Sequence, residues 1–167
     1  MIIKHFGIAS AVICLTACGQ MTADPGSART PTERPNEIMG VASVIDGDTI
    51  EIHGRHMRLS GFDSPERDRQ CANVNVYQQA VNYLSDRLAA RIVTCRVTGK
   101  SYDRDVAVCS VGGADLGDLM VGAGWARDWP KYSHGAYKDV EARARAAHEG
   151  IWNLDCPDDL WGDRRYD

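Results

Sequence analysis

The chain has 167 residues, of which 44% are hydrophobic and 25% charged, and its formal net charge is -4 at pH 7. This composition is typical of one globular domain with a sizeable core, and it argues against a disordered chain. The negative charge also argues against a protein that coats nucleic acid, because such binding needs an extended basic face. A small local phosphate-binding site stays compatible with it.

The first residues have the layout of a secretory signal peptide. Lys4 precedes an apolar run over residues 6–17, and this run is too short to span a bilayer reliably. Leu-Thr-Ala-Cys at residues 15–18 resembles a bacterial lipobox, whose cysteine is lipidated. We therefore expect residues 1–17 to be removed and Cys18 to anchor the exported chain by lipid, with the outer membrane as the expected location. The alternative is an ordinary signal, which would leave a periplasmic or secreted protein.

Residues 18–36 contain three prolines and few apolar residues, which predicts a flexible tether between the anchor and a domain over residues 37–167. Alternating hydrophobicity and turn signals then predict antiparallel strands at the start of that domain. The expected strands cover residues 40–46, 49–54 and 56–61.

The pattern changes to helical spacing over residues 75–90, which predicts an amphipathic helix. A second hairpin is expected next, with strands at 91–98 and 105–111 and its midpoint near Tyr102. Two further helices are expected at residues 116–121 and 136–149, each followed by glycine.

These elements predict the α+β class with about three helices. Five short strands with an intervening helix further suggest a five-stranded β-barrel of the oligonucleotide/oligosaccharide-binding (OB) type. Periodicity alone gives the α+β class and not the barrel.

Four cysteines remain beyond the signal region, namely Cys71, Cys95, Cys109 and Cys156. In an exported domain they indicate two disulfides, for which three pairings exist. Cys95 and Cys109 lie symmetrically about Tyr102, which favours their pairing and leaves Cys71 with Cys156. The cysteine and histidine spacings do not match a structural zinc site.

The stretch VIDGDTIEIHGRHMRLSGFDSPE, residues 44–66, places four acidic side chains on two loops. Asp46 and Asp48 share one turn, Asp63 and Glu66 share a loop after the third strand, and Arg58 lies on the strand between. Carboxylates on converging loops repel one another unless a cation sits among them, and oxygen ligands suit calcium better than zinc. Taken alone, each fragment is better explained structurally, DGD as a hairpin turn and FDSPE as a turn with a helix-start signature.

The two fragments together resemble the staphylococcal nuclease-like (thermonuclease) domain, whose signature is an IDGDT turn, an arginine-bearing strand and a D-[ST/A]-P-E loop. Residues 101–104, Ser-Tyr-Asp-Arg, are similar to a second signature of that family. DLGDLMVGAGWA and EGIWN are similar to its short helix and closing segment, so the resemblance covers about residues 40–154.

The resemblance implies a calcium-dependent nuclease that hydrolyses phosphodiester bonds of DNA and RNA with little sequence specificity. It implies that Asp48 and Asp63 bind Ca²⁺, that Ser64 adds a backbone carbonyl, and that Asp46 lies close by. These hard oxygen ligands leave coordination positions for water and a phosphate oxygen.

The resemblance also implies the catalytic residues. Glu66 would act as general base or orient the attacking water, while Arg58 and Arg104 would clamp the scissile phosphate. Tyr102 and Tyr132 would bind substrate, although Tyr102 could equally cap the hairpin and the alignment around Tyr132 is loose.

One position departs from the family pattern, because Asp103 stands where the family has glycine. The added negative charge lies beside Arg104, whose alternative role is a surface ion pair with Asp103 or Asp105. Asp103 and the acidic composition slightly favour a second class of function, an inactive OB-type module that binds nucleic acid or an envelope ligand. A structural lipoprotein is a third class. The sequence implies no protein partner, and we expect a monomer.

Overall fold

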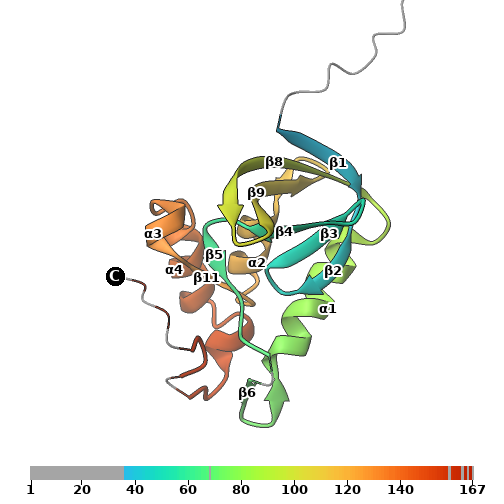
Figure 1. Cartoon of the computed structure of the whole chain (residues 1–167). Coiled ribbons are helices and arrows are strands. Elements are labelled where there is room, and N and C mark those ends of the chain that lie inside the picture. Colours follow the sequence, from blue (N-terminus) through green and yellow to red (C-terminus); the bar gives the residue numbers. More distant parts are fainter. Residues whose placement is uncertain (1–35, 68, 158, 163, 165, 167) are drawn as a thin grey trace, which may run out of the picture. The chain divides into compact units, whose positions relative to one another are not determined.

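The computed structural model describes residues 36–67, 69–157, 159–162, 164 and 166. The expected signal peptide, Cys18 and all of the tether except Asn36 lie outside these residues. The fold is α+β, as expected from the sequence, with helices packed on one seven-stranded sheet (Figure 1). Within the described part of the chain, no helix is both long and apolar enough to cross a membrane.

The expected strand at residues 40–46 is two strands, because the chain changes its pairing partner at Ala42. β1 (Glu37–Val41) pairs with β8 (Ile92–Ser101), whereas β2 (Ser43–Asp46) pairs with β3 (Thr49–Ile52). β3 then pairs with β4, Arg55–Leu59, which confirms the predicted run of antiparallel strands.

The second hairpin is also confirmed. β8 runs antiparallel to β9 (Arg104–Val111), and β9 runs parallel to β4, with Arg58 opposite Val106. This pairing joins the two hairpins into one sheet and brings the start of β9 close to the end of β4. The strand order is β1-β8-β9-β4-β3-β2, and β10, Ala114–Asp115, also pairs with β9.

The three expected helices are present, with ends that differ by a few residues. Asn75 caps the first of them by accepting a hydrogen bond from the backbone N–H of Gln78, and its residues Ala80, Leu84 and Leu88 are buried in the core. They are α1 (Val76–Leu88), α2 (Leu116–Gly122) and α4 (Lys138–Ala146).

The sequence did not predict a fourth helix, α3 (Pro130–Ser133), or the 3₁₀ helix η1 (Gly150–Asn153). Each has only four residues, which is too short to show a helical period. Two short ladders were not predicted either. β5 (Phe62–Asp63) pairs with β11 (Arg127–Asp128), and β6 (Gln70–Cys71) pairs with β7 (Val74–Asn75).

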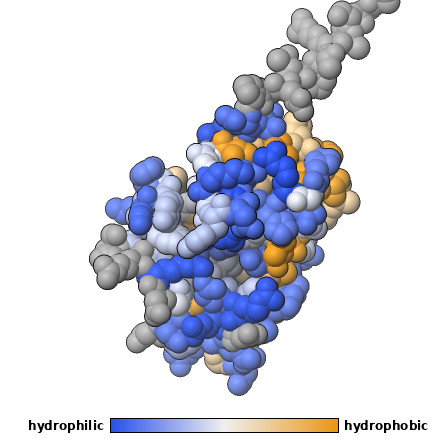
Figure 2. Space-filling view, in the orientation of Figure 1, coloured by the Kyte–Doolittle hydropathy of each residue, from blue (hydrophilic) through white to orange (hydrophobic). Residues whose placement is uncertain are grey.

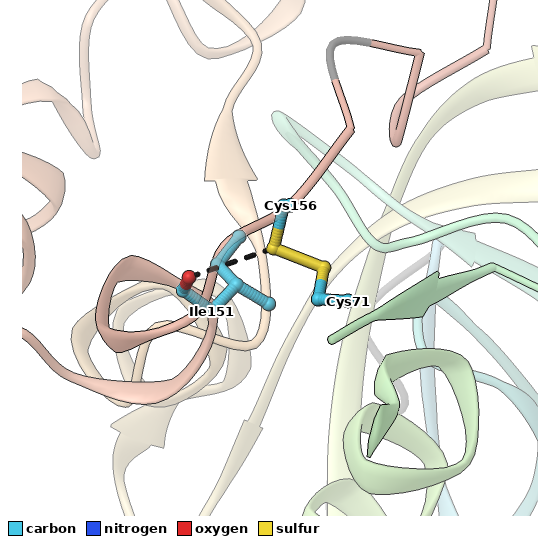
Figure 3. The surroundings of a disulfide bond; sticks show 3 residues. All are labelled: Cys71, Ile151 and Cys156. Atoms are coloured by element: carbon cyan, nitrogen blue, oxygen red, sulfur yellow. Dashed lines mark hydrogen bonds between the residues drawn. A yellow bond between two sulfur atoms is a disulfide. The ribbon is translucent and has the colours of Figure 1, made fainter. Parts of the chain in front are cut away.

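Both expected disulfides are present. Cys95 and Cys109 are direct neighbours across β8 and β9, and the Cys71–Cys156 bridge joins β6 to the segment after η1 (Figure 3). The sulfur of Cys156 also lies 3.7 Å from the carbonyl oxygen of Ile151. Two disulfides indicate an extracytoplasmic protein, because such bonds persist in oxidising compartments.

The face of the domain in Figure 2 is mostly hydrophilic, and some apolar residues gather at the end where β1 and β8 lie. Met39 and Val41 on β1 and Ile92 on β8 are each about half exposed. None of the three lines the cavities described below.

Candidate functional site

The β2–β3 turn packs directly on the loop that follows β5, as the sequence predicted. The backbone N–H of Ser64 donates a hydrogen bond to Oδ2 of Asp48 at 3.2 Å. A Cβ atom at Gly47 would lie 1.9 Å from Oγ of Ser64, so only glycine allows this approach. The contact brings the two acidic loops together.

Arg58 lies between the two buried aspartates of these loops. Its Nη2 atom is 3.0 Å from Oδ2 of Asp48 and 3.0 Å from Oδ1 of Asp63. The same guanidinium donates to the backbone carbonyls of Leu59 at 2.9 Å and Phe62 at 3.2 Å. The expected phosphate-clamping arginine therefore also forms ion pairs with both carboxylates and is held in place by backbone carbonyls.

One arginine does not neutralise this cluster. Burial raises the pKa of Asp48 to about 7, and the nearby charges of Asp46 and Asp63 add to the rise, while Arg58 opposes it. Ionised Asp48 is thus disfavoured until a further positive charge approaches.

A cavity of about 200 Å³ opens above these residues. It gathers six of the predicted site residues from three separate parts of the chain. They are Asp46, Asp48, Arg58, Ser64, Glu66 and Arg104. Asp63 lies beneath them and is fully buried.

Arg104 faces this cavity from the start of β9. Its Nη1 atom lies 3.4 Å from Oγ1 of Thr49. The alternative ion pair with Asp105 is not formed, because Asp105 pairs instead with Arg55 and Lys100, at 2.5 Å and 2.7 Å. Asp103 is not among the residues with positive φ, so the turn does not require the family's glycine there.

A second cavity of about 520 Å³ shares Arg58 and Arg104 with the first. The two predicted substrate-binding tyrosines lie here and not in the acidic cavity. Tyr102 is at the hairpin tip and 96% exposed, while Tyr132 is about half exposed and packs edge-on against Trp129.

The donor atoms fit a hard divalent cation such as Ca²⁺. Asp48 and Asp63 supply carboxylates from two loops, and Oγ of Ser64 is buried with no hydrogen-bond partner. Among the described residues, no group of three or more acidic, histidine or cysteine side chains is arranged around one point. Two carboxylates would therefore need carbonyl, water or phosphate oxygens to complete the ion's shell.

Two residues near the C-terminus also reach this site, and no motif or periodicity in the sequence indicates them. Arg164 forms ion pairs with Oδ1 of Asp63 and Oε1 of Glu66, and the hydroxyl of Tyr166 donates to Oδ2 of Asp63. Burial and the hydrogen bond to Asp63 raise the pKa of Tyr166, which keeps its hydroxyl protonated as a donor. Arg164 lines both cavities.

The chain is similar to a protein family and to a named relative. Residues 56–154 match the family described as Staphylococcal nuclease homologue. The chain is also 33% identical over 140 residues to Succinoglycan biosynthesis protein ExoI from Rhizobium meliloti (strain 1021), which covers 79% of this chain and 70% of that protein. The family match includes Arg58, Asp63, Glu66 and Arg104, and it begins after the Asp46–Asp48 turn.

Proposed function

The chain belongs to the staphylococcal nuclease homologue family, and we propose that it is a calcium-dependent nuclease that hydrolyses phosphodiester bonds of DNA and RNA with little sequence specificity. The observation that carries this proposal is the convergence of acids and arginines from three separate segments on one cavity. Glu66 and Asp48 face the cavity from two loops, and Arg104 faces it from β9.

Asp48, Asp63 and the carbonyl of Ser64 would hold the calcium ion, which when bound polarises a phosphate oxygen as a Lewis acid. Glu66 accepts a proton from the attacking water or orients it. Arg104 and Arg58 bind the non-bridging oxygens, where negative charge grows as water attacks and the 5′ oxygen leaves.

The wider second cavity supports a nucleic-acid substrate. Tyr102, Tyr132 and Trp129 line it beside the two arginines, and aromatic rings stack on bases of any sequence. Recognition by stacking agrees with low sequence specificity.

The proposal extends to closure of the sheet into a barrel and to a membrane anchor. β1 and β2, the two ends of the strand order, are consecutive along the chain and separated only by Ala42, which supports closure into an OB-type barrel. We extend the proposal to a lipid anchor at Cys18 in the outer membrane, a tether over residues 18–36 and a monomeric domain over residues 37–167.

The test is cleavage of plasmid DNA, single-stranded DNA and RNA by the full chain with its disulfides formed, in calcium or in excess chelator. Glu66→Gln and Arg104→Ala should each lower the rate by about 10²- to 10⁴-fold. Arg91→Gln is the matched control, because Arg91 is exposed and lines neither cavity. Absence of cleavage by the folded wild type in millimolar calcium would overturn the proposal.

A second candidate is a non-catalytic module that binds nucleic acid or another envelope ligand. The name of the relative ExoI, a succinoglycan biosynthesis protein, favours an envelope role, and the negative net charge slightly favours a non-catalytic module. Binding of polynucleotide or polysaccharide without any chelator-sensitive turnover would support this candidate over the nuclease.

A further inference from the structure

Both carboxylate oxygens of Asp63 already accept hydrogen bonds or ion pairs from side chains of the protein. Its Oδ1 atom contacts both Arg58 and Arg164, and its Oδ2 atom accepts a hydrogen bond from Tyr166. The side chain is fully buried, so no face of this carboxylate is open to solvent. A cation that binds through Asp63 must therefore displace at least one of these three donors.

Arg164 is the donor that can leave. Arg58 comes from a central strand, and its guanidinium also binds the carbonyls of Leu59 and Phe62. Arg164 lies near the C-terminus, its side chain is 31% exposed, and among the described residues its ion pairs are with Asp63 and Glu66. A positive charge at this position also repels an approaching divalent ion.

Arg164 and Tyr166 are both held close to the site, which makes the arginine a strong local competitor. The ring of Tyr166 stacks on the guanidinium of Arg127 at 3.7 Å, and Arg164 lies over the ring of Trp129 at 5.6 Å. The Cys71–Cys156 disulfide fixes the chain at Cys156, eight residues before Arg164. A tethered ligand acts at a high effective concentration, so even a modest ion pair competes with a dissolved cation.

We propose that Arg164, supported by Tyr166, is an intramolecular competitor for the calcium site. Without calcium it occupies Asp63 and Glu66, and it must withdraw when calcium binds. Its withdrawal also releases Glu66, the residue placed to accept the proton. Arg164 and Tyr166 thus set the calcium concentration at which the site becomes competent, an inference that rests on the calcium-dependent function proposed above.

Isothermal titration of the full chain with CaCl₂, in the absence of nucleic acid, tests this inference. Arg164→Gln should lower the calcium Kd by about 5- to 10-fold, since it removes one partly exposed ion-pair network. Arg164→Lys, which keeps the charge, should stay within about twofold of wild type. Tyr166→Phe should lower the Kd by about twofold, because it removes one hydrogen bond that an uncharged hydroxyl donates to the Asp63 carboxylate.

Arg91→Gln, which removes an exposed arginine elsewhere, should leave the Kd unchanged. An unchanged or higher Kd in Arg164→Gln would overturn the competition. An equal gain in affinity for Arg164→Lys would do the same, because the charge would then not matter. Either of these two results would refute only the competition, and not the calcium site, if wild type binds calcium and Asp48→Asn does not. If neither wild type nor Arg164→Gln binds calcium, the proposed function falls with it.

Discussion

Two buried aspartates, Asp48 in the β2–β3 turn and Asp105 on β9, have opposite electrostatic surroundings. Asp105 is the single acid between Lys100 at 2.7 Å and Arg55 at 2.5 Å. The hydrogen bond from Lys100, together with Arg55, lowers its pKa even though burial acts in the other direction. Asp48 is buried with two further aspartates nearby and shares one arginine with Asp63, and its pKa rises to about 7.

The opposite pKa shifts distinguish a carboxylate that stabilises the fold, Asp105, from one that needs a bound cation to ionise favourably, Asp48. At Asp105 the chain supplies more positive charge than the carboxylate needs, so ionisation stabilises the fold. At Asp48 the chain supplies too little, and ionisation opposes folding unless a cation is added. The C-terminal Arg164 adds part of the missing charge from a distant point of the sequence.

A different disulfide cross-links each of the two regions. Removing these disulfides should give the largest losses in the free energy of unfolding. Cys71–Cys156 spans 85 residues and Cys95–Cys109 spans 14. Loop-closure entropy then predicts losses of about 4.5 and about 3 kcal/mol when each pair is replaced by serine. Urea unfolding of the two double variants measures both. A larger loss for the short loop would show that strand contacts, and not chain entropy, dominate.

Removal of the arginine beside each aspartate should have the next largest effect. Arg58→Met leaves Asp48 and Asp63 without their shared counter-ion and should cost about 4 kcal/mol in chelator. Arg55→Met should cost only about 1 kcal/mol, because Arg55 is half exposed and Lys100 remains on Asp105. Similar losses in denaturant unfolding would contradict the contrast between the two sites.

The same substitution at the two aspartates should have opposite signs in chelator at pH 8. Asp48→Asn should stabilise the protein by about 2 kcal/mol, since it removes a buried charge that the chain does not neutralise. Asp105→Asn should destabilise it by about 2 kcal/mol, since it leaves Lys100 and Arg55 without a charged partner. Destabilisation by both variants would refute the distinction.

The pH dependence of stability gives a smaller effect with a defined sign. Folding raises the pKa of Asp48, so its contribution is most favourable near pH 4 and declines as pH rises to about 7, by at most about 1.4 kcal/mol per pH unit. Folding lowers the pKa of Asp105, so its contribution is present above about pH 4 and is lost as pH falls below it.

Urea unfolding in chelator from pH 3 to 8 measures this profile. Asp48→Asn should flatten the decline between pH 4 and 7 while leaving the acid limb intact. A decline that persists unchanged in Asp48→Asn would assign it to another group.

Much of the site could be predicted because local patterns encode it. The turn at Asp46–Asp48 and the loop at Asp63–Glu66 flank strands whose alternation is clear, and strand pairing brings them together. The symmetry of Cys95 and Cys109 about the hairpin midpoint likewise predicts their bond.

Long-range contacts without a local pattern could not be predicted. Arg164 and Asp63 are separated by 101 residues, and nothing in the periodicity near the C-terminus indicates where that arginine lies. The division of the first strand at Ala42 was also missed, because alternation continues through it while the hydrogen-bonding partner changes.

Thermal unfolding with and without calcium tests whether the Asp48 cluster binds an added cation. Wild type, Asp48→Asn and Asp105→Asn would be compared in excess chelator and in millimolar calcium. Calcium should raise the Tm of wild type and of Asp105→Asn by similar amounts and leave the Tm of Asp48→Asn unchanged. An equal rise in Asp48→Asn, or no rise in wild type, would contradict calcium binding by this cluster.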